Sequence, residues 1–211
     1  MEVAVIIPAF NEEERIGKVL EVVTQVEIIS QLVVVSDGST DDTAKTARLF
    51  TKDVIELEKN IGKGGAIMAG FAYSQADIIL LLDADLIGLK REHVLALLEP
   101  VIQGEVEATV GIFSSGRLFT DWAQKIAPFL SGQRVLKRTI LKDIQKLDHT
   151  SYGFELALTK YLHARKVDVK KVFLYGISHI MKEEKLGLYR GFLWRLRMYW
   201  QILRSINVDI K

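Results

Sequence analysis

Apolar and polar positions alternate along the first half of the chain in a regular order. Continuous apolar runs rich in β-branched residues are typical of strands buried on both faces of a parallel sheet. Three such runs predict strands at 3–7, 32–35 and 78–82. Apolar residues at helical spacing predict helices at 12–23, 41–49 and 64–73. In the first of these, Ile16, Val19, Leu20 and Val23 share one face. Strands alternating with helices indicate an α/β fold with a mostly parallel sheet.

The second half of the chain has a less regular pattern. It predicts strands at 106–112 and 169–175, and helices at 118–127, 152–163 and 188–206. The chain contains no segment with the composition of a linker. We therefore predict one domain with three parts: a first half at 1–112, a second half at 113–187 and an amphipathic C-terminal helix at 188–211.

Composition narrows the class of protein. The 211 residues are 49% hydrophobic, and 28 basic and 27 acidic residues give a net charge of +1, which argues against a nucleic-acid-binding protein. The absence of cysteine excludes disulfides, thiolate metal sites and a cysteine nucleophile, and fits a cytoplasmic protein. The longest stretch without a charged residue has 13 residues, 64–76, whereas a membrane-spanning helix needs about 20.

Each of the three predicted strands of the first half is followed by polar residues. These clusters are Asn11-Glu12, Asp37-Gly38-Ser39 and Asp83-Ala84-Asp85. Ligands of open α/β sheets bind outside the carboxyl ends of strands, so we expect the three clusters to form one site. The carboxylates of Asp83 and Asp85 suit a divalent cation that prefers oxygen ligands. The alternative is that they only cap the following loop.

Two of the surrounding segments are candidates for contacts with a nucleotide. Asp37 lies at a strand end, where it can accept hydrogen bonds from a base or ribose, while Ser39 or Thr40 is expected to cap the next helix. The turn at 60–65 contains Lys63 and Gly64 and leads into a helix, so its backbone N–H groups and its positive charge suit an anion. A simple loop is the alternative for this turn.

Three further features have both a functional and a structural interpretation. His179 follows an apolar stretch and is a candidate metal ligand or a structural histidine. Glu155 is a candidate catalytic base, although a carboxylate in the first turn of a helix is also favoured by the helix dipole. The segment 188–206 has an apolar face and an arginine-bearing face, so it either lies in a membrane interface or packs on its own domain.

Four motifs resemble one known family. Pro8–Glu12, Asp37–Thr43, Lys63–Ala66 and Asp83–Asp85 occur in the order and spacing of family 2 glycosyltransferases with the GT-A fold. That fold is a three-layer sandwich with a mostly parallel mixed sheet. The resemblance implies nucleotide contacts at these residues: Pro8, Phe10, Glu12, Asp37 and Lys63. It also implies that Asp85 coordinates Mg²⁺ or Mn²⁺, with Asp83 nearer the ribose or beside the metal.

The second half resembles the acceptor side of related enzymes. Segments 128–134 and 152–155, followed by His179, are similar to motifs of glucosyl-3-phosphoglycerate synthases. In that family a histidine completes the metal site, so the resemblance implies a metal site made of Asp83, Asp85 and His179. Polyprenyl-phosphate glycosyltransferases carry a similar Gly-Phe-Glu element, which here is Gly153-Phe154-Glu155.

These observations together predict a metal-dependent glycosyltransferase. It would move a hexose from a UDP- or GDP-sugar to a phosphorylated small molecule or a polyprenyl phosphate, with Glu155 and Asp85 as catalytic residues. The anionic acceptor is expected near three basic residues: Arg134, Lys137 and Arg138. Whether the sugar's configuration is inverted or retained stays open, as do a homodimer and peripheral attachment to a membrane through 188–206.

Two other functions remain as alternatives. A nucleotidyltransferase would need a glycine-rich basic loop after the first strand, where this chain has Pro8–Glu12. A non-catalytic nucleotide-binding protein with a membrane-facing tail would bind a nucleotide without turning over a sugar donor.

Overall fold

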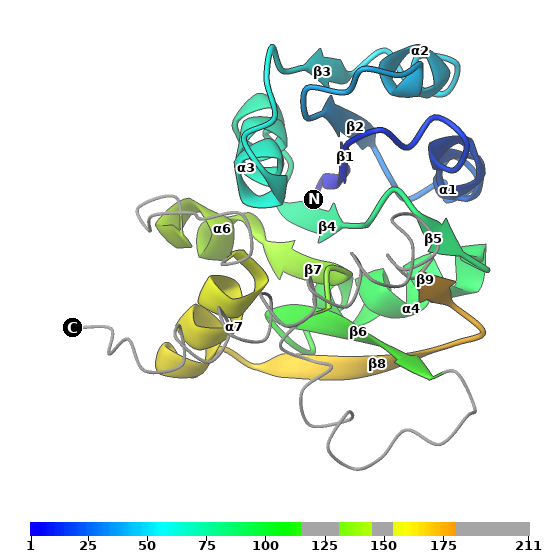
Figure 1. Ribbon diagram of the computed structural model, residues 1–211. Coiled ribbons are helices and arrows are strands. Elements are labelled where there is room, and N and C mark those ends of the chain that lie inside the picture. Colours follow the sequence, from blue (N-terminus) through cyan, green and yellow to red (C-terminus); the bar gives the residue numbers. More distant parts are fainter. Residues whose placement is uncertain (115–130, 145–153, 180–211) are drawn as a thin grey trace, which may run out of the picture. The chain divides into compact units, whose positions relative to one another are not determined.

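The computed structural model describes residues 1–114, 131–144 and 154–179 (Figure 1). Met1–Ser178 form one compact unit, and His179–Lys211 form a second. The helices predicted at 118–127 and 188–206 lie outside the described residues. In the part of the chain that is described, every helix is too short or too polar to cross a membrane.

A seven-stranded sheet forms the centre of the first unit. Its strands, in chain order, are β1 (Val3–Ala9), β2 (Gln31–Ser36), β3 (Val54–Glu56), β4 (Ile78–Leu81), β6 (Ala108–Ser114), β7 (Arg134–Lys137) and β8 (Val169–Tyr175). Their spatial order is β3-β2-β1-β4-β7-β6-β8. β7 is antiparallel to its neighbours β4 and β6, and the other neighbouring pairs are parallel. A two-stranded sheet pairs β5 (Leu86–Ile87) with β9 (Ser178–His179).

Helices cover both faces of the large sheet (Figure 1). One face carries α1 (Ile16–Val23), α2 (Thr43–Ala47) and α4 (Arg91–Ile102), and the other carries α3 (Lys63–Tyr73), α6 (Arg138–Ile144) and α7 (Phe154–Ala164). Successive residues of a strand point to opposite faces. Val5 and Ile7 of β1 accordingly pack in the hydrophobic cluster of α1 and α4, and Ala4 and Ile6 in that of α3 and α7. The predicted three-layer α/β fold is confirmed.

Several element boundaries differ from the prediction for local reasons. β1 was expected to stop before Pro8 but continues to Ala9. β4 pairs with β1 only as far as Ile6, so at Pro8 the missing N–H breaks no ladder bond to β4. The expected N-cap by Ser39 or Thr40 is wrong, because Asp42 precedes α2 and makes no side-chain cap bond.

Candidate active site

The three polar clusters meet at one edge of the sheet, as predicted. β1, β2 and β4 are parallel neighbours, so their carboxyl ends lie together. The backbone N–H of Asn11 donates to the Ser39 hydroxyl at 3.1 Å, and the Asn11 side-chain oxygen accepts from the Thr40 N–H at 2.8 Å. Ser39 and Thr40 therefore join the ends of β1 and β2 instead of capping α2.

Asp37 shapes the glycine-rich turn before α3. Its side chain is buried, and its two carboxylate oxygens accept the backbone N–H groups of Ile61 at 2.8 Å and Gly62 at 2.9 Å. Gly62 has a φ of +87°, in the region that favours glycine. Asp37 thus fixes the backbone that carries Lys63. Its predicted contact with a base or ribose stays a prediction.

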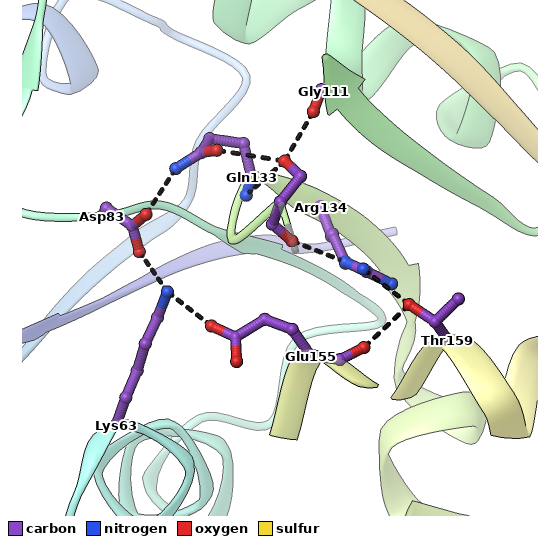
Figure 2. Close-up of polar contacts among 8 residues, drawn as sticks. Lys63, Asp83, Gly111, Gln133, Arg134, Glu155 and Thr159 are labelled. Carbon is purple, nitrogen blue, oxygen red and sulfur yellow. Dashed lines mark hydrogen bonds and ion pairs between the residues drawn. The ribbon is translucent and has the colours of Figure 1, made fainter. Parts of the chain in front are cut away.

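Lys63 joins two carboxylates that come from different parts of the chain (Figure 2). Its Nζ lies 2.5 Å from Asp83 Oδ1, just after β4, and 2.7 Å from Glu155 Oε1, in the first turn of α7. The exposed fraction of the Lys63 side chain is 31%, against 16% for Asp83 and 15% for Glu155. Burial alone would lower the pKa of Lys63, but the charges of Asp83 and Glu155 raise it well above its ordinary value. Lys63 therefore carries a full positive charge at neutral pH.

The segment before β7 supports Asp83 from the other side. Gln133 Nε2 donates to Asp83 Oδ2 at 2.8 Å, and Gln133 Oε1 lies 3.1 Å from the Ser131 hydroxyl (Figure 2). Between these residues, Gly132 leaves no room for a side chain. A Cβ atom there would lie 2.5 Å from Lys63 Nζ and 2.7 Å from each Asp83 oxygen.

Arg134 is buried and is linked to the Glu155 backbone through Thr159. Its Nε donates to the Ser131 carbonyl at 2.9 Å, and its Nη2 donates to the Thr159 hydroxyl at 2.8 Å. That hydroxyl in turn donates to the Glu155 carbonyl at 2.8 Å. Burial lowers the pKa of Arg134 to about 10, with the Glu155 charge acting in the opposite direction, so the guanidinium remains charged at neutral pH.

The three basic residues expected to meet an acceptor do not lie together. β7 is antiparallel to β4, so Arg134 pairs with Leu81 at the carboxyl end of β4 and Lys137 pairs with Ile78 at its beginning. The Arg138 guanidinium lies over the Phe71 ring, 4.4 Å from its centroid. The expectation that Lys137 and Arg138 line the same site as Arg134 is therefore wrong.

The remaining predicted nucleotide residues have different settings. Pro8 is half-buried in β1, and Phe10 is exposed just after it. Glu12 is buried and pairs with Arg15 at 3.0 Å. Gly64 is buried in α3, where a Cβ atom would lie 3.1 Å from Phe154 Cβ of α7, so helix packing explains this glycine. Contacts of these residues with a nucleotide stay predictions.

The predicted metal ligands fit a divalent cation only in part. Asp85 is half-buried and offers the hard carboxylate oxygens that Mg²⁺ and Mn²⁺ prefer. Both oxygens of Asp83 already accept bonds from Lys63 and Gln133, so a metal at Asp83 would compete with these contacts. Across residues 1–114, 131–144 and 154–179, no three carboxylate or histidine side chains form a metal-binding group. His179 ends β9, and its side chain lies outside the described residues.

Sequence reasoning missed three residues that organise this site. Ser131 and Gln133 fall in the segment 128–134. This segment resembles an acceptor motif, but the resemblance gave neither residue a role. Thr159 lies one helical turn after Glu155, and nothing in its sequence context sets it apart.

Comparison with solved structures defines the class of fold. Glucosyl-3-phosphoglycerate synthase from Mycobacterium tuberculosis, solved with Mn²⁺, UDP-glucose and phosphoglyceric acid, is 26% identical with a TM-score of 0.70. The match covers 84% of this chain and 71% of that one. The same enzyme solved with Mg²⁺ and UDP matches with the same identity, coverage and TM-score. The seven-stranded mixed sheet is GT-A-like, as predicted.

The family follows from the sequence match. Residues 4–163 match the model of Glycosyl transferase family 2, so the chain belongs to this family. The predicted glycosyltransferase is thereby confirmed at the level of the family. The 4,4'-diaponeurosporenoate glycosyltransferase of Staphylococcus aureus (strain USA300) is 36% identical over 107 residues, which are 48% of this chain. The match spans 28% of the length of that enzyme, so the similarity is limited to one part of each protein.

Proposed function

We propose that this chain transfers a hexose from a UDP- or GDP-sugar to a phosphorylated acceptor, assisted by Mg²⁺ or Mn²⁺. The observation that carries the proposal is the Lys63 ammonium, which is fixed between Asp83 and Glu155 at the carboxyl end of β4. The similar M. tuberculosis synthase was solved with UDP-glucose and phosphoglyceric acid, which favours a uridine donor and a small phosphorylated acceptor.

Lys63 has the charge that the departing diphosphate requires. As the bond between the sugar C1 and the diphosphate oxygen breaks, negative charge grows on the leaving group. A fixed positive charge stabilises that developing charge more than a mobile one does, because it needs no reorganisation. A divalent cation held by Asp85 would, when bound, offset the same charge. Asp83 and Glu155 hold the ammonium in place before the donor arrives.

The role of Glu155 depends on whether the anomeric configuration is inverted or retained. If the configuration is inverted, the acceptor oxygen bonds to C1 and its proton passes to a positioned carboxylate, for which Glu155 is the candidate. If the configuration is retained, the leaving diphosphate takes that proton and Glu155 only positions Lys63 and the sugar. The anomeric configuration of the product, determined by NMR, distinguishes the two.

The test is a donor and acceptor panel. The protein is incubated with Mn²⁺ or Mg²⁺ and UDP- or GDP-hexoses, with phosphoglyceric acid and a polyprenyl phosphate as acceptors in separate arms. Release of nucleoside diphosphate and the mass of the product are followed. Turnover with one acceptor supports the proposal and names the acceptor class. Nucleotide binding without turnover of any donor would favour the non-catalytic alternative.

Asp85 provides the test of the metal. Asp85→Ala should remove metal-dependent nucleotide binding. The matched control is Asp77→Ala, which removes a carboxylate at the opposite end of β4, where it accepts the Glu2 backbone N–H at 2.9 Å. Equal metal dependence in both variants would show that the metal assignment is wrong.

A further inference from the structure

We propose that Gln133 is a positioning residue of this site, because its side-chain amide fixes the Asp83 carboxylate and, through it, the Lys63 ammonium. The catalytic consequence rests on the proposed function. The hydrogen-bonded arrangement itself can be tested without it.

A continuous set of hydrogen bonds leads from β6 to Lys63 (Figure 2). The Ser131 hydroxyl lies 2.5 Å from the Gly111 carbonyl oxygen of β6 and 3.1 Å from Gln133 Oε1. Because a carboxylate oxygen can only accept, the Gln133 amide must turn its NH₂ group to Asp83 Oδ2, at 2.8 Å. The other Asp83 oxygen faces Lys63 at 2.5 Å. Each oxygen of Asp83 therefore has its own donor.

Gln133 is itself held firmly. Its side chain is fully buried, and its backbone carbonyl accepts the Gly111 N–H at 2.8 Å. The backbone of Gln133 is thus tied to β6, and its side-chain NH₂ group to Asp83. A buried group with these partners cannot turn without leaving polar atoms unpaired, which is costly. Gln133 is therefore a rigid support, whereas Lys63 is a long and flexible side chain.

The geometry explains why this support affects Lys63. A carboxylate rotates as a plane, so fixing Oδ2 also fixes the direction in which Oδ1 points. Without the Gln133 amide, Asp83 would keep its charge but lose the constraint on its plane. The Lys63 side chain would then sample more conformations. Binding a diphosphate would have to restrict them, which costs conformational entropy. The expected result is weaker nucleotide binding at an intact fold.

A double-mutant cycle tests whether Gln133 acts through Asp83. Gln133→Ala, Asp83→Ala and the double variant are compared for binding of UDP with Mn²⁺ by calorimetry, and for melting temperature without ligand. Gln133→Ala should weaken UDP binding by roughly tenfold, as expected for one hydrogen bond to a charged group. In the Asp83→Ala background it should weaken binding by less than about twofold, because the partner is already gone.

Thr109→Val is the matched control. It removes a buried hydrogen bond between β6 and α4, in which the Thr109 hydroxyl donates to the Leu97 carbonyl at 2.8 Å. The control should lower the melting temperature as Gln133→Ala does but leave UDP affinity unchanged. Its effect on the melting temperature should add to that of Asp83→Ala, whereas the effect of Gln133→Ala should not.

The outcomes separate this inference from the proposed function. If Asp83→Ala weakens UDP binding but Gln133→Ala does not, the positioning role is wrong and the function stands. If the wild-type protein binds no UDP with Mn²⁺, the uridine donor of the proposed function is wrong, and the melting-temperature cycle alone decides the positioning role. Additive effects of Gln133→Ala and Asp83→Ala on melting temperature would overturn it in that case.

Discussion

Gly132→Ala should lower activity strongly and change stability little. The added Cβ would lie 2.5 Å from Lys63 Nζ and 2.7 Å from both Asp83 oxygens, where ordinary contact begins at 3.4 Å. The ends of these side chains must therefore move by about 0.7–0.9 Å. A displacement of about 1 Å in a catalytic constellation can cost roughly 100-fold in rate. We expect kcat/KM to fall by about that factor, or about 2.7 kcal/mol of transition-state stabilisation.

The fold should tolerate the same change. The atoms that must move are the ends of side chains and not backbone, and replacing glycine by alanine also reduces the entropy of the unfolded chain, which stabilises by about 0.4–1 kcal/mol. We therefore expect the melting temperature to change by less than about 4 °C.

Steady-state kinetics with the active donor and thermal melting measure the two effects of Gly132→Ala. The control is Gly17→Ala in α1, where the nearest atoms to an added Cβ are 3.7–3.9 Å away. It should leave kcat/KM unchanged and keep or raise the melting temperature. Unchanged kcat/KM in Gly132→Ala would refute the view that the close contact among Lys63, Asp83 and residue 132 matters for turnover.

Other substitutions test the remaining contacts. Lys63→Met removes the ammonium that contacts both Asp83 and Glu155, so UDP affinity, measured by calorimetry, should fall at least about tenfold. Asp37→Ala removes the acceptor of two backbone N–H groups and should cost about 2–5 kcal/mol in chemical denaturation, with weaker nucleotide binding. Thr159→Val removes the hydroxyl that donates to the Glu155 carbonyl and should cost about 1–3 kcal/mol by the same method. If one of these variants leaves its measured quantity unchanged, the role given to the corresponding contact is wrong.

The central strands and their helices were predictable because burial dictates their residues. The continuous apolar runs became β1, β2 and β4, and Val169–Tyr175 forms β8 at the expected bounds. Ile16 and Leu20, predicted on one face of a helix, are fully buried in α1. In these elements the local pattern and the tertiary environment agree, so the sequence alone is sufficient.

The sequence pattern did not reveal β7 or α4. β7 has four residues, of which only Val135 and Leu136 are apolar, and its position depends on pairing with β4 and β6. α4 contains Pro100, a residue that normally argues against a helix interior. In both cases tertiary contacts decide the structure.

The site was predictable as a set of residues but not as an arrangement. Lys63, Asp83 and Glu155 were each nominated from their place at a strand end or a helix start. Their mutual contact depends on α7 packing beside α3, which no local pattern encodes. The same holds for Asp37, whose carboxylate holds the glycine-rich turn across more than twenty residues of chain.

β7 lies far from β4 in the sequence, and this limits where the chain can be truncated to give a stable fragment. β4 has β7 as its neighbour on the side away from β1, yet more than fifty residues of chain separate Leu81 from its partner Arg134. While the chain is being synthesised, that side of β4 stays unpaired until β7 emerges. A fragment ending at residue 112 would expose the same edge, which favours aggregation, and would lack Gln133 and Glu155. We expect a stable nucleotide-binding fragment only when the expressed chain extends beyond β8.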